Sequence, residues 1–169
     1  QFWRECQNML VQMSRSCRGA IGKNNLLTYR NTGDHDKGED YTYCNDGFIR
    51  LPSGLDMRYG DLEYVQGERG LEFSYKTRRG RTRIYGGKVT ENVCQAIARC
   101  IMGEQMLAIA KRYKPVLTVH DSVVCCVPDG ELVEARQYIE ECMSTTPSWA
   151  EGMPITCESG IGKSYGDCE

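Results

Sequence analysis

Two short apolar runs separated by three polar residues constrain the fold of this chain most. The runs are Val116–Val119 and Val123–Val127, and His120, Asp121 and Ser122 lie between them. This pattern predicts a β-hairpin whose tight turn exposes an imidazole and a carboxylate at the tip of an otherwise buried sheet. A carboxylate fixed at a hairpin tip is a rigid ligand for a hard cation such as Mg²⁺. The alternative is a polar turn in which His and Asp occur only because turns favour them.

Length and charge indicate an ordinary globular protein. The 169 residues suffice for one domain, or one and a fraction, with a real core. No apolar run of about 18 residues occurs, so we expect no membrane span. The net charge of −2, from 21 basic and 23 acidic residues, argues against a surface that binds nucleic acid everywhere, but it leaves room for a local basic strip. The chain opens on Gln1 rather than Met, which favours a piece of a longer protein.

The ten cysteines predict reduced thiols rather than a metal site. None of them forms a C-x-x-C pair, which argues against a zinc ribbon or a thioredoxin-like motif. Those within apolar stretches should act as small hydrophobic core residues; they are Cys94, Cys100, Cys125, Cys126 and Cys142. Free thiols are typical of a cytosolic protein.

The N-terminal half reads as a helix followed by strands. Apolar residues at three- and four-residue steps predict an amphipathic helix that Gly19 and Gly22 end. These apolar residues are Phe2, Trp3, Cys6, Met9, Leu10, Met13 and Cys17. A polar loop over Asn31–Asp40 follows. Alternating apolar residues then predict a β-meander with strands at Phe48–Leu51, Leu55–Tyr59, Leu62–Val65 and Leu71–Tyr75.

A basic cluster and a long helix come next. Lys76–Arg83, predicted to lie on a turn, is either a solvated loop or a strip that contacts phosphates. Lys88–Arg112 has the periodicity of a helix with one apolar face, which includes Leu107. Its opposite face could bind a minor-groove edge or a sugar-phosphate backbone, or it could simply face water. That face carries Lys88, Glu91, Asn92, Gln95, Arg99 and Met102.

Beyond the hairpin we expect one more helix and one more strand. Asp129 is placed to cap a third helix. The inward residues of this helix would be Leu132, Ala135, Ile139 and Cys142. Pro154–Glu158 could form a last strand before a short glycine-rich tail.

Five motifs, taken together, resemble the C-terminal end of family A DNA polymerases, the group of bacterial DNA polymerase I and many phage replicative polymerases. The phage members look closer. The motifs follow the family's order, and from the first motif to the last the resemblance spans about three quarters of the chain. They are IRLPSGLDMRYGDLEY (Ile49–Tyr64), IYGGKVTENVCQAIARCIM (Ile84–Met102), LTVHDSVVCCVP (Leu117–Pro128), STTPSWAEGMPITCE (Ser144–Glu158) and the closing GIGKSYG.

The resemblance implies an α+β fold, an antiparallel palm-type sheet with the motif C β-hairpin packed against long helices. Residues 1–169 would be a partial polymerase core, with residues 1–30 a helix from the end of the fingers and residues 45–169 the second half of the palm. VHD resembles motif C, which makes Asp121 one of two aspartates that hold a pair of Mg²⁺ ions. In that chemistry the ions lie about 4 Å apart and activate the primer 3′-OH for attack on the α-phosphate.

The resemblance also implies DNA contacts. His120 would lie beside the primer terminus, and Gln95 would touch the minor groove near the new base pair, with Arg99 on the same helix face. Further candidates for DNA contact are Asn92, Lys88, Arg81 and Arg83. The implied partners are primer-template DNA and a deoxynucleoside triphosphate, in the cytoplasm of a bacterial or phage-infected host cell.

Two departures from the family pattern limit the expected activity. The family usually reads VHDE, whereas this chain has Ser122 in place of the glutamate. The chain also lacks motif A, D-x-S-x-x-E, and the fingers helix that grips the triphosphate. One aspartate holds Mg²⁺ only weakly, so we expect no polymerisation without the remainder of the polymerase, in another chain or an upstream segment. Apolar surface that this remainder would cover predicts a homo-oligomer.

Two other functions remain open. A non-catalytic palm module that binds DNA or a partner polymerase would explain the missing motif A and the missing glutamate. A metal-dependent nuclease could combine Asp121 with Glu91 or Asp61, although nothing in the spacing groups these carboxylates.

Overall fold

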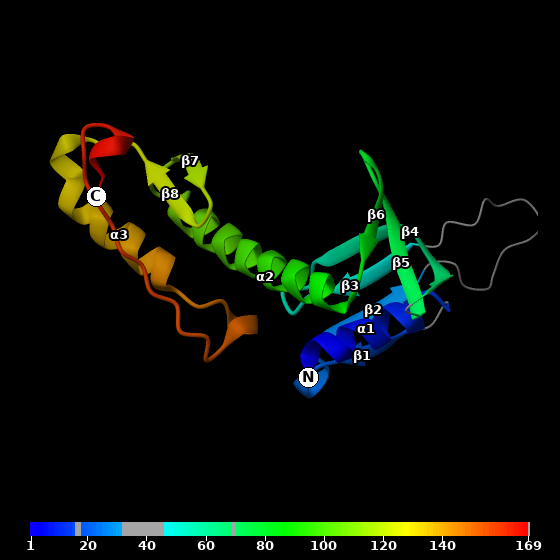
Figure 1. Cartoon of the computed structure of the whole chain (residues 1–169). Coiled ribbons are helices and arrows are strands. Elements are labelled where there is room, and N and C mark those ends of the chain that lie inside the picture. Colours follow the sequence, from blue (N-terminus) through cyan, green and yellow to red (C-terminus); the bar gives the residue numbers. More distant parts are fainter. Residues whose placement is uncertain (16–17, 32–45, 69, 169) are drawn as a thin grey trace, which may run out of the picture. The chain divides into compact units, whose positions relative to one another are not determined.

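The chain divides into two compact units, each built from helices and antiparallel strands (Figure 1). The computed structural model describes residues 1–15, 18–31, 46–68 and 70–168. The N-terminal unit is Gln1–Ile97 and the C-terminal unit is Ala98–Glu169. Helix α2 (Gly86–Ile109) begins in the first unit and ends in the second. The predicted α+β class is confirmed.

The N-terminal unit is organised by a six-stranded sheet in which every strand pairs with the next along the chain. All the pairs are antiparallel. The strands are β1 (Gly19–Ile21), β2 (Leu27–Asn31), β3 (Gly47–Arg50), β4 (Asp56–Gly67), β5 (Gly70–Thr77) and β6 (Gly80–Ile84). A β-bulge interrupts β4 between Gly60 and Glu63, where Asp61 has a φ of 49°. The predicted meander is therefore present, with its second and third segments joined in one strand.

Helix α1 (Phe2–Met13) lies against β1 and β2 and supplies part of the core. Its apolar face is buried against the sheet and the start of α2. The buried residues of this core include Cys6, Met9, Leu10, Met13, Leu27, Ile49, Leu62, Phe73, Ile84, Val89 and Val93. At Gly86 the backbone of α2 touches α1, because its N–H donates to Gln7 Oε1 at 2.6 Å. A Cβ at this position would lie 2.3 Å from the Trp3 carbonyl oxygen, so only glycine fits there.

The C-terminal unit consists of the end of α2, a two-stranded hairpin and helix α3 (Leu132–Ser144). The hairpin strands are β7 (Pro115–Val119) and β8 (Ser122–Cys125). The core of this unit is built around Ile109, Tyr113, Ala135 and Cys142. Gln105 is also buried, and its Nε2 donates to the carbonyl oxygens of Met143 at 2.6 Å and Thr145 at 3.2 Å.

The structure corrects the predicted N-terminal helix. The helix ends at Met13, and residues 19–31 contribute β1 and β2, so a helix over residues 1–30 is wrong. Strand pairing overrides the apolar period here, because Tyr29 pairs with Ile49 on β3. The predicted polar loop Asn31–Asp40 lies, apart from Asn31, outside the described residues.

Other predictions at chain ends and turns are also wrong. Arg81 and Arg83 lie on β6 rather than on a turn, because alternating polar residues there pair with β5. Asp129 belongs to a short 3₁₀ turn, and no side chain caps α3. Residues 154–158 form no strand.

The long helix differs from its predicted faces in two places. Leu107, expected in the core, is exposed, and Met102, expected on the polar face, is buried. Of the cysteines expected in the core, Cys142 is buried, whereas Cys94 and Cys126 are exposed. No helix in the described part of the chain combines the length and apolarity needed to cross a bilayer.

Candidate functional site

The tip of the β7–β8 hairpin presents His120 and Asp121. Val119 pairs with Ser122, which leaves these two residues as the whole loop. A two-residue hairpin loop needs at least one residue with positive φ, and His120 supplies it with a φ of 53°. This left-handed conformation costs a non-glycine residue about 1–2 kcal/mol. Both side chains are exposed, so the predicted hairpin and its exposed tip are confirmed.

The hairpin is held from one side only. Val123, Cys125 and Val127 pack against the core of the C-terminal unit, and burial raises the pKa of the Cys125 thiol. Val116 and Leu117 are 52% and 46% exposed. The expectation of an otherwise buried sheet is therefore wrong, because none of the described residues covers Val116 and Leu117. The packed side still fixes the direction in which the tip projects.

Asp121 offers one carboxylate to solvent. None of the described residues forms an ion pair or a hydrogen bond with it that would fix its rotamer. Within the described ranges, no three His, Cys, Asp or Glu side chains gather as a metal site would require. Mg²⁺ needs near-octahedral oxygen ligands and gives up its waters reluctantly. The described residues therefore supply one ligand position and do not make a magnesium site by themselves.

The predicted polar face of α2 has internal partners near its start. Lys88 Nζ lies 2.9 Å from both carboxylate oxygens of Glu91, which raises the pKa of the lysine. Gln95 Nε2 donates to Glu91 Oε1 at 3.4 Å. Lys88 and Gln95 thus share one carboxylate, and both side chains are exposed.

Asn92 has a different role from its neighbours on the helix. Its Nδ2 donates to the Tyr59 hydroxyl at 3.1 Å. Tyr59 is buried, and this burial raises the pKa of its phenol to about 12. Asn92 therefore satisfies a buried hydroxyl of the sheet. Arg99, one turn beyond Gln95, has its Nη1 3.5 Å from Met102 Sδ.

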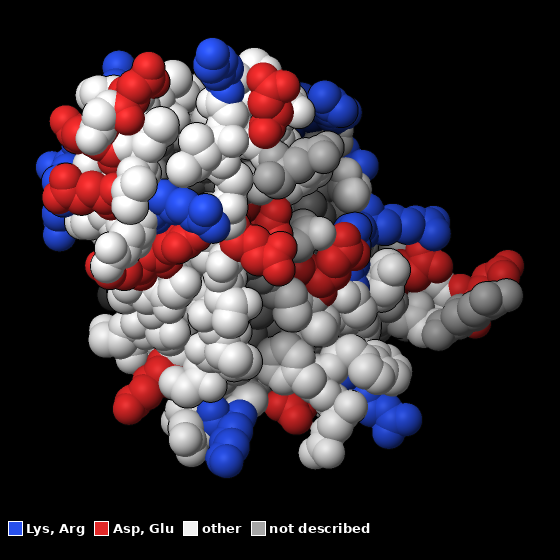
Figure 2. Space-filling view, turned by 90° about the vertical axis from the view of Figure 1, so that its left-hand side faces the viewer, with Lys and Arg blue, Asp and Glu red and all other residues white. Residues whose placement is uncertain are grey.

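The arginines of β6 are bound to neighbouring strands. The guanidinium of Arg81 lies 2.8 Å from both Asp61 Oδ2 and Glu63 Oε2. Arg83 Nη2 lies 3.2 Å from Glu72 Oε2. These contacts follow from the strand register, so Arg81 and Arg83 form ion pairs with neighbouring strands of the sheet. The face drawn in Figure 2 carries both basic and acidic side chains, with several acidic ones grouped across its middle.

The predicted site residues fall into two groups. Lys88, Asn92, Gln95, Arg81 and Arg83 belong to the N-terminal unit, and the structure brings Lys88 and Gln95 together at Glu91. The C-terminal unit holds the other candidates, which are Arg99, His120 and Asp121.

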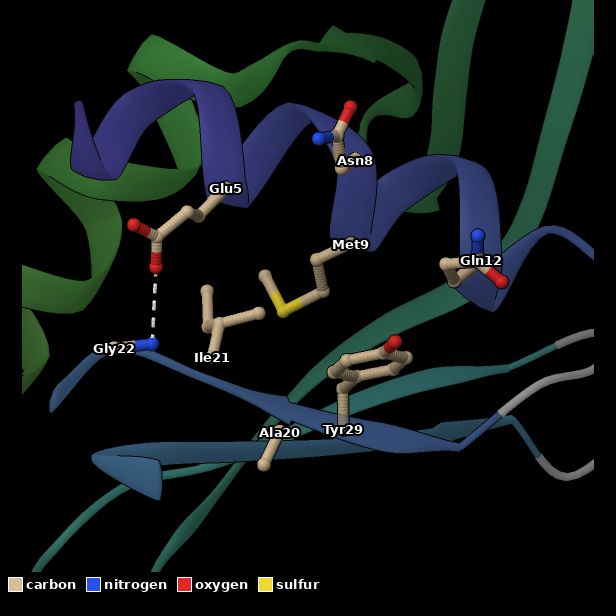
Figure 3. A pocket seen from close by; sticks show the side chains of 8 residues that line it. All are labelled: Glu5, Asn8, Met9, Gln12, Ala20, Ile21, Gly22 and Tyr29. Atoms are coloured by element: carbon tan, nitrogen blue, oxygen red, sulfur yellow. Dashed lines mark hydrogen bonds between the residues drawn. The ribbon is translucent and has the colours of Figure 1, made fainter. Parts of the chain in front are cut away.

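A pocket of about 350 Å³ lies between α1 and the strands β1 and β2 (Figure 3). Glu5 and Gln12 line it from the helix, and Tyr29 lies opposite them. Glu5 Oε2 accepts a hydrogen bond from the Gly22 N–H at 3.1 Å. The one carboxylate of this pocket thus fixes the chain between β1 and β2.

The sequence interpretation missed one group of residues, the arginines of β2, β3 and β4. Arg30, Arg50 and Arg58 are exposed and lie near Phe48 in the strand register. The sequence places an arginine beside the apolar residues of each of these strands. These arginines were missed as a group because the pairing of β2 with β3 was not predicted.

A known protein is similar to much of this chain. The chain is 34% identical over 126 residues to a protein named DNA polymerase from Bacillus phage SP02. The chain is similar to part of a DNA polymerase. The match covers 70% of this chain and 19% of that polymerase, so the chain spans about a fifth of the relative's length. No family model matches the chain, and no solved structure matches it.

Proposed function

We propose that this chain is the C-terminal part of a family A DNA polymerase core and that Asp121 is one of its two metal-binding aspartates. The observation that carries the proposal is the exposed His120-Asp121 loop of the hairpin, in a chain similar to a DNA polymerase. In the family pattern these residues are the last two of the VHD motif.

The proposed reaction is template-directed nucleotidyl transfer to a primer 3′-OH. Mg²⁺ bound at such a site activates the hydroxyl and neutralises charge on the phosphates. Asp121 supplies one carboxylate ligand, and an aspartate of motif A, from the remainder of the polymerase, supplies the other. His120 lies beside the primer terminus, while Gln95 and Arg99 contact the minor groove. Arg81, Arg83, Lys88 and Asn92 are the weaker candidates, because the first three form ion pairs and Asn92 bonds a buried hydroxyl. Gln95 makes only a longer hydrogen bond to Glu91, at 3.4 Å.

The assignment of the chain's parts follows from the same proposal. The hairpin, the sheet and α3 belong to the second half of the palm, and α1 comes from the end of the fingers. A nuclease is less well supported, because Asp61 binds Arg81 and Glu91 binds Lys88.

The test is primer extension by a mixture of two polypeptides. The 169-residue chain alone should show no Mg²⁺-dependent extension, because it supplies one carboxylate. Addition of a polypeptide that carries motif A and the fingers should restore extension, since binding would bring a second aspartate beside Asp121. In the mixture Asp121→Ala should abolish extension.

Ser122→Ala is the matched control, because it changes the next residue of the hairpin without removing a carboxylate. It should retain most of the restored extension. Extension by the chain alone, or an Asp121→Ala mixture as active as the unmodified one, would show that the assignment is wrong.

A second candidate function is a non-catalytic palm module that binds DNA or a partner polymerase. The observation in its favour is Ser122, which stands where the family has a second acidic residue. For such a module, no motif A polypeptide would restore extension, although the mixture would still bind primer-template DNA.

The proposal also includes self-association. Val116 and Leu117 expose apolar surface on the hairpin, and exposed apolar patches favour association. Sedimentation at high protein concentration should therefore show a dimer or a larger species. A clean monomer would contradict this part of the proposal.

A further inference from the structure

The two faces of the strands β2, β3 and β4 carry different side chains. Tyr29 and Ile49 are cross-strand partners, and Tyr29 faces α1 across the pocket of Figure 3. Cross-strand partners point to the same face of a sheet, and the next residue points to the other face. Arg30 and Phe48, which are also partners, therefore lie on the face opposite α1.

The same register adds three more residues to this face. Phe48 pairs with Arg58, and Arg50 pairs with Asp56. We call Arg30, Phe48, Arg50, Asp56 and Arg58 the arginine face. Its three arginine side chains are 51%, 59% and 62% exposed, in chain order.

An arginine stacks on an aromatic ring at the centre of the arginine face. The guanidinium carbon of Arg30 lies 4.3 Å from the centroid of the Phe48 ring. A hollow of about 220 Å³ opens beside this stack, and its lining includes Thr28, Arg30, Phe48, Arg50 and Asp56. A flat guanidinium fixed over a ring offers a planar surface on which a nucleobase can stack.

The charge of the arginine face is unbalanced. Arg30 and Arg50 share one carboxylate, Asp56, at 3.2 Å and 3.9 Å. Arg58 is held by Asp46 at 2.6 Å. Among the described residues, one carboxylate between these two arginines leaves positive charge beside the hollow. Exposed ion pairs contribute only about 0–1 kcal/mol, so a phosphate can compete with Asp56 for the guanidinium groups of Arg30 and Arg50.

We propose that the arginine face binds single-stranded DNA, with one base stacked on Arg30 and Phe48 in the hollow and the neighbouring phosphates at the arginines. Interleaved basic and aromatic side chains are the chemistry that single-stranded nucleic acid requires. A base within a duplex is already stacked and cannot enter the hollow. The inference goes beyond the proposed polymerase function, because this binding needs neither Asp121 nor a metal ion.

The first test measures the stack. Fluorescence anisotropy of a labelled oligothymidylate is followed with the whole chain in EDTA. Phe48→Ala should weaken binding by about 5- to 150-fold, the range for removal of a base-aromatic contact. Phe48→Leu keeps the apolar bulk without the ring and should weaken binding nearly as much. Circular dichroism establishes that each variant is folded, and wild-type binding by folded Phe48→Leu would overturn the proposal.

The second test measures the arginines. Affinity is measured at several salt concentrations, and the slope of log affinity against log salt is compared. The double variant Arg30→Gln/Arg50→Gln should reduce the steepness of this slope by about 1.4, since each phosphate contact on a single strand contributes about 0.7. Arg4→Gln/Arg136→Gln removes the same charge from α1 and α3 and is the matched control. This control should keep the wild-type slope. An equal loss in both double variants would overturn the proposal, since it would show dependence on net charge alone.

Competitors separate the alternatives. Duplex DNA of the same sequence content should compete poorly, and so should polyglutamate of equal charge. If duplex DNA competes as well as single-stranded DNA does, the arginine face binds duplex phosphates. If polyglutamate competes as well, the partner is an acidic protein. Either result overturns the proposal. Failure of primer extension with intact binding of single strands would count against the polymerase function only.

Discussion

The predicted site residues of the two units differ in whether they have charged partners. In the N-terminal unit, the predicted DNA-contact residues Arg81, Arg83 and Lys88 are bound by carboxylates of the same unit. At the hairpin tip of the C-terminal unit, Asp121 projects into solvent, and no described residue is bound to it. Strand register creates the first arrangement and a two-residue loop creates the second.

This difference shows what a charge pattern alone can predict. A basic cluster in a sequence does not reveal whether carboxylates lie across the neighbouring strand, whereas three polar residues between two short β-branched runs predict a turn. The hairpin was therefore the more reliable of the two structural predictions. Arg30 and Arg50, on β2 and β3, share one carboxylate and lie outside the cluster that the sequence singles out.

The largest expected effect concerns the close contact between α2 and α1 in the N-terminal unit. Gly86→Ala should destabilise the N-terminal unit by about 3 kcal/mol, because its Cβ would meet the Trp3 carbonyl oxygen and the Gln7 nitrogen, which are backbone atoms. Gly103→Ala is the matched control in the same helix, since no described atom comes within 4 Å of a Cβ there. It should stabilise the helix by up to about 1 kcal/mol. Urea unfolding measures both, and equal effects would show that the contact of α2 with α1 is not tight.

A smaller effect is expected at the buried amide of the C-terminal unit. Gln105→Ala should cost about 2 kcal/mol, because two carbonyl oxygens at the end of α3 would lose their donor. Gln137→Ala removes the same group from an exposed position, where it bonds only Glu141, and should cost a few tenths of a kcal/mol at most. If urea unfolding gives the same loss for both variants, Gln105 does not fasten α3 to α2.

Asn92 tests whether a predicted DNA contact is structural. Asn92→Ala should cost about 1 kcal/mol of stability, because the buried Tyr59 hydroxyl would lose its donor. Tyr59→Phe removes the other partner, and in the Tyr59→Phe background Asn92→Ala should cost less. Urea unfolding of the four variants in this double-mutant cycle measures the coupling. Strictly additive losses would remove the structural role and return Asn92 to the DNA-contact candidates.

The sequence predicts best where one local rule decides the outcome. The hairpin follows from two β-branched runs around a polar pair, and α2 follows from a long helical period. The end of α1 and the strands β1 and β2 were missed, because pairing with β3 decides them and no local signal marks that partner.

The predicted site residues show the same contrast between local signals and strand pairing. The exposure of Asp121 could be predicted from its place in a two-residue loop. The partners of Arg81 could not, because Asp61 and Glu63 lie at the bulge of β4. The partner of Arg83 could not either, because it depends on the pairing of β5 with β6. The stack of Arg30 on Phe48 depends on the same kind of register and was missed for the same reason.

The smallest expected effect depends on pH and concerns the chain that follows α3. The hydroxyl of Ser159 donates to Glu140, and Arg136 Nε lies 3.0 Å from the same carboxylate oxygen. The hydrogen bond from Ser159 and then the one from Arg136 lower the pKa of Glu140. A carboxyl group with a lowered pKa stabilises the folded state above its unfolded value of about 4.3. This stabilisation is lost as the pH falls through the lower, folded-state pKa.

Ser159→Ala should therefore reduce stability slightly near neutral pH, and the difference from the wild type should shrink as the pH falls through the pKa of Glu140. Carbon NMR titration of the Glu140 carboxyl should show a higher pKa in this variant, because the bond to the charged form is gone. Ser164→Ala removes a hydroxyl that bonds Asp167 in the same segment and should leave the Glu140 titration unchanged. If Ser159→Ala also leaves that titration unchanged, Arg136 alone sets the charge of Glu140, and the segment after α3 is not held to the helix through this carboxylate.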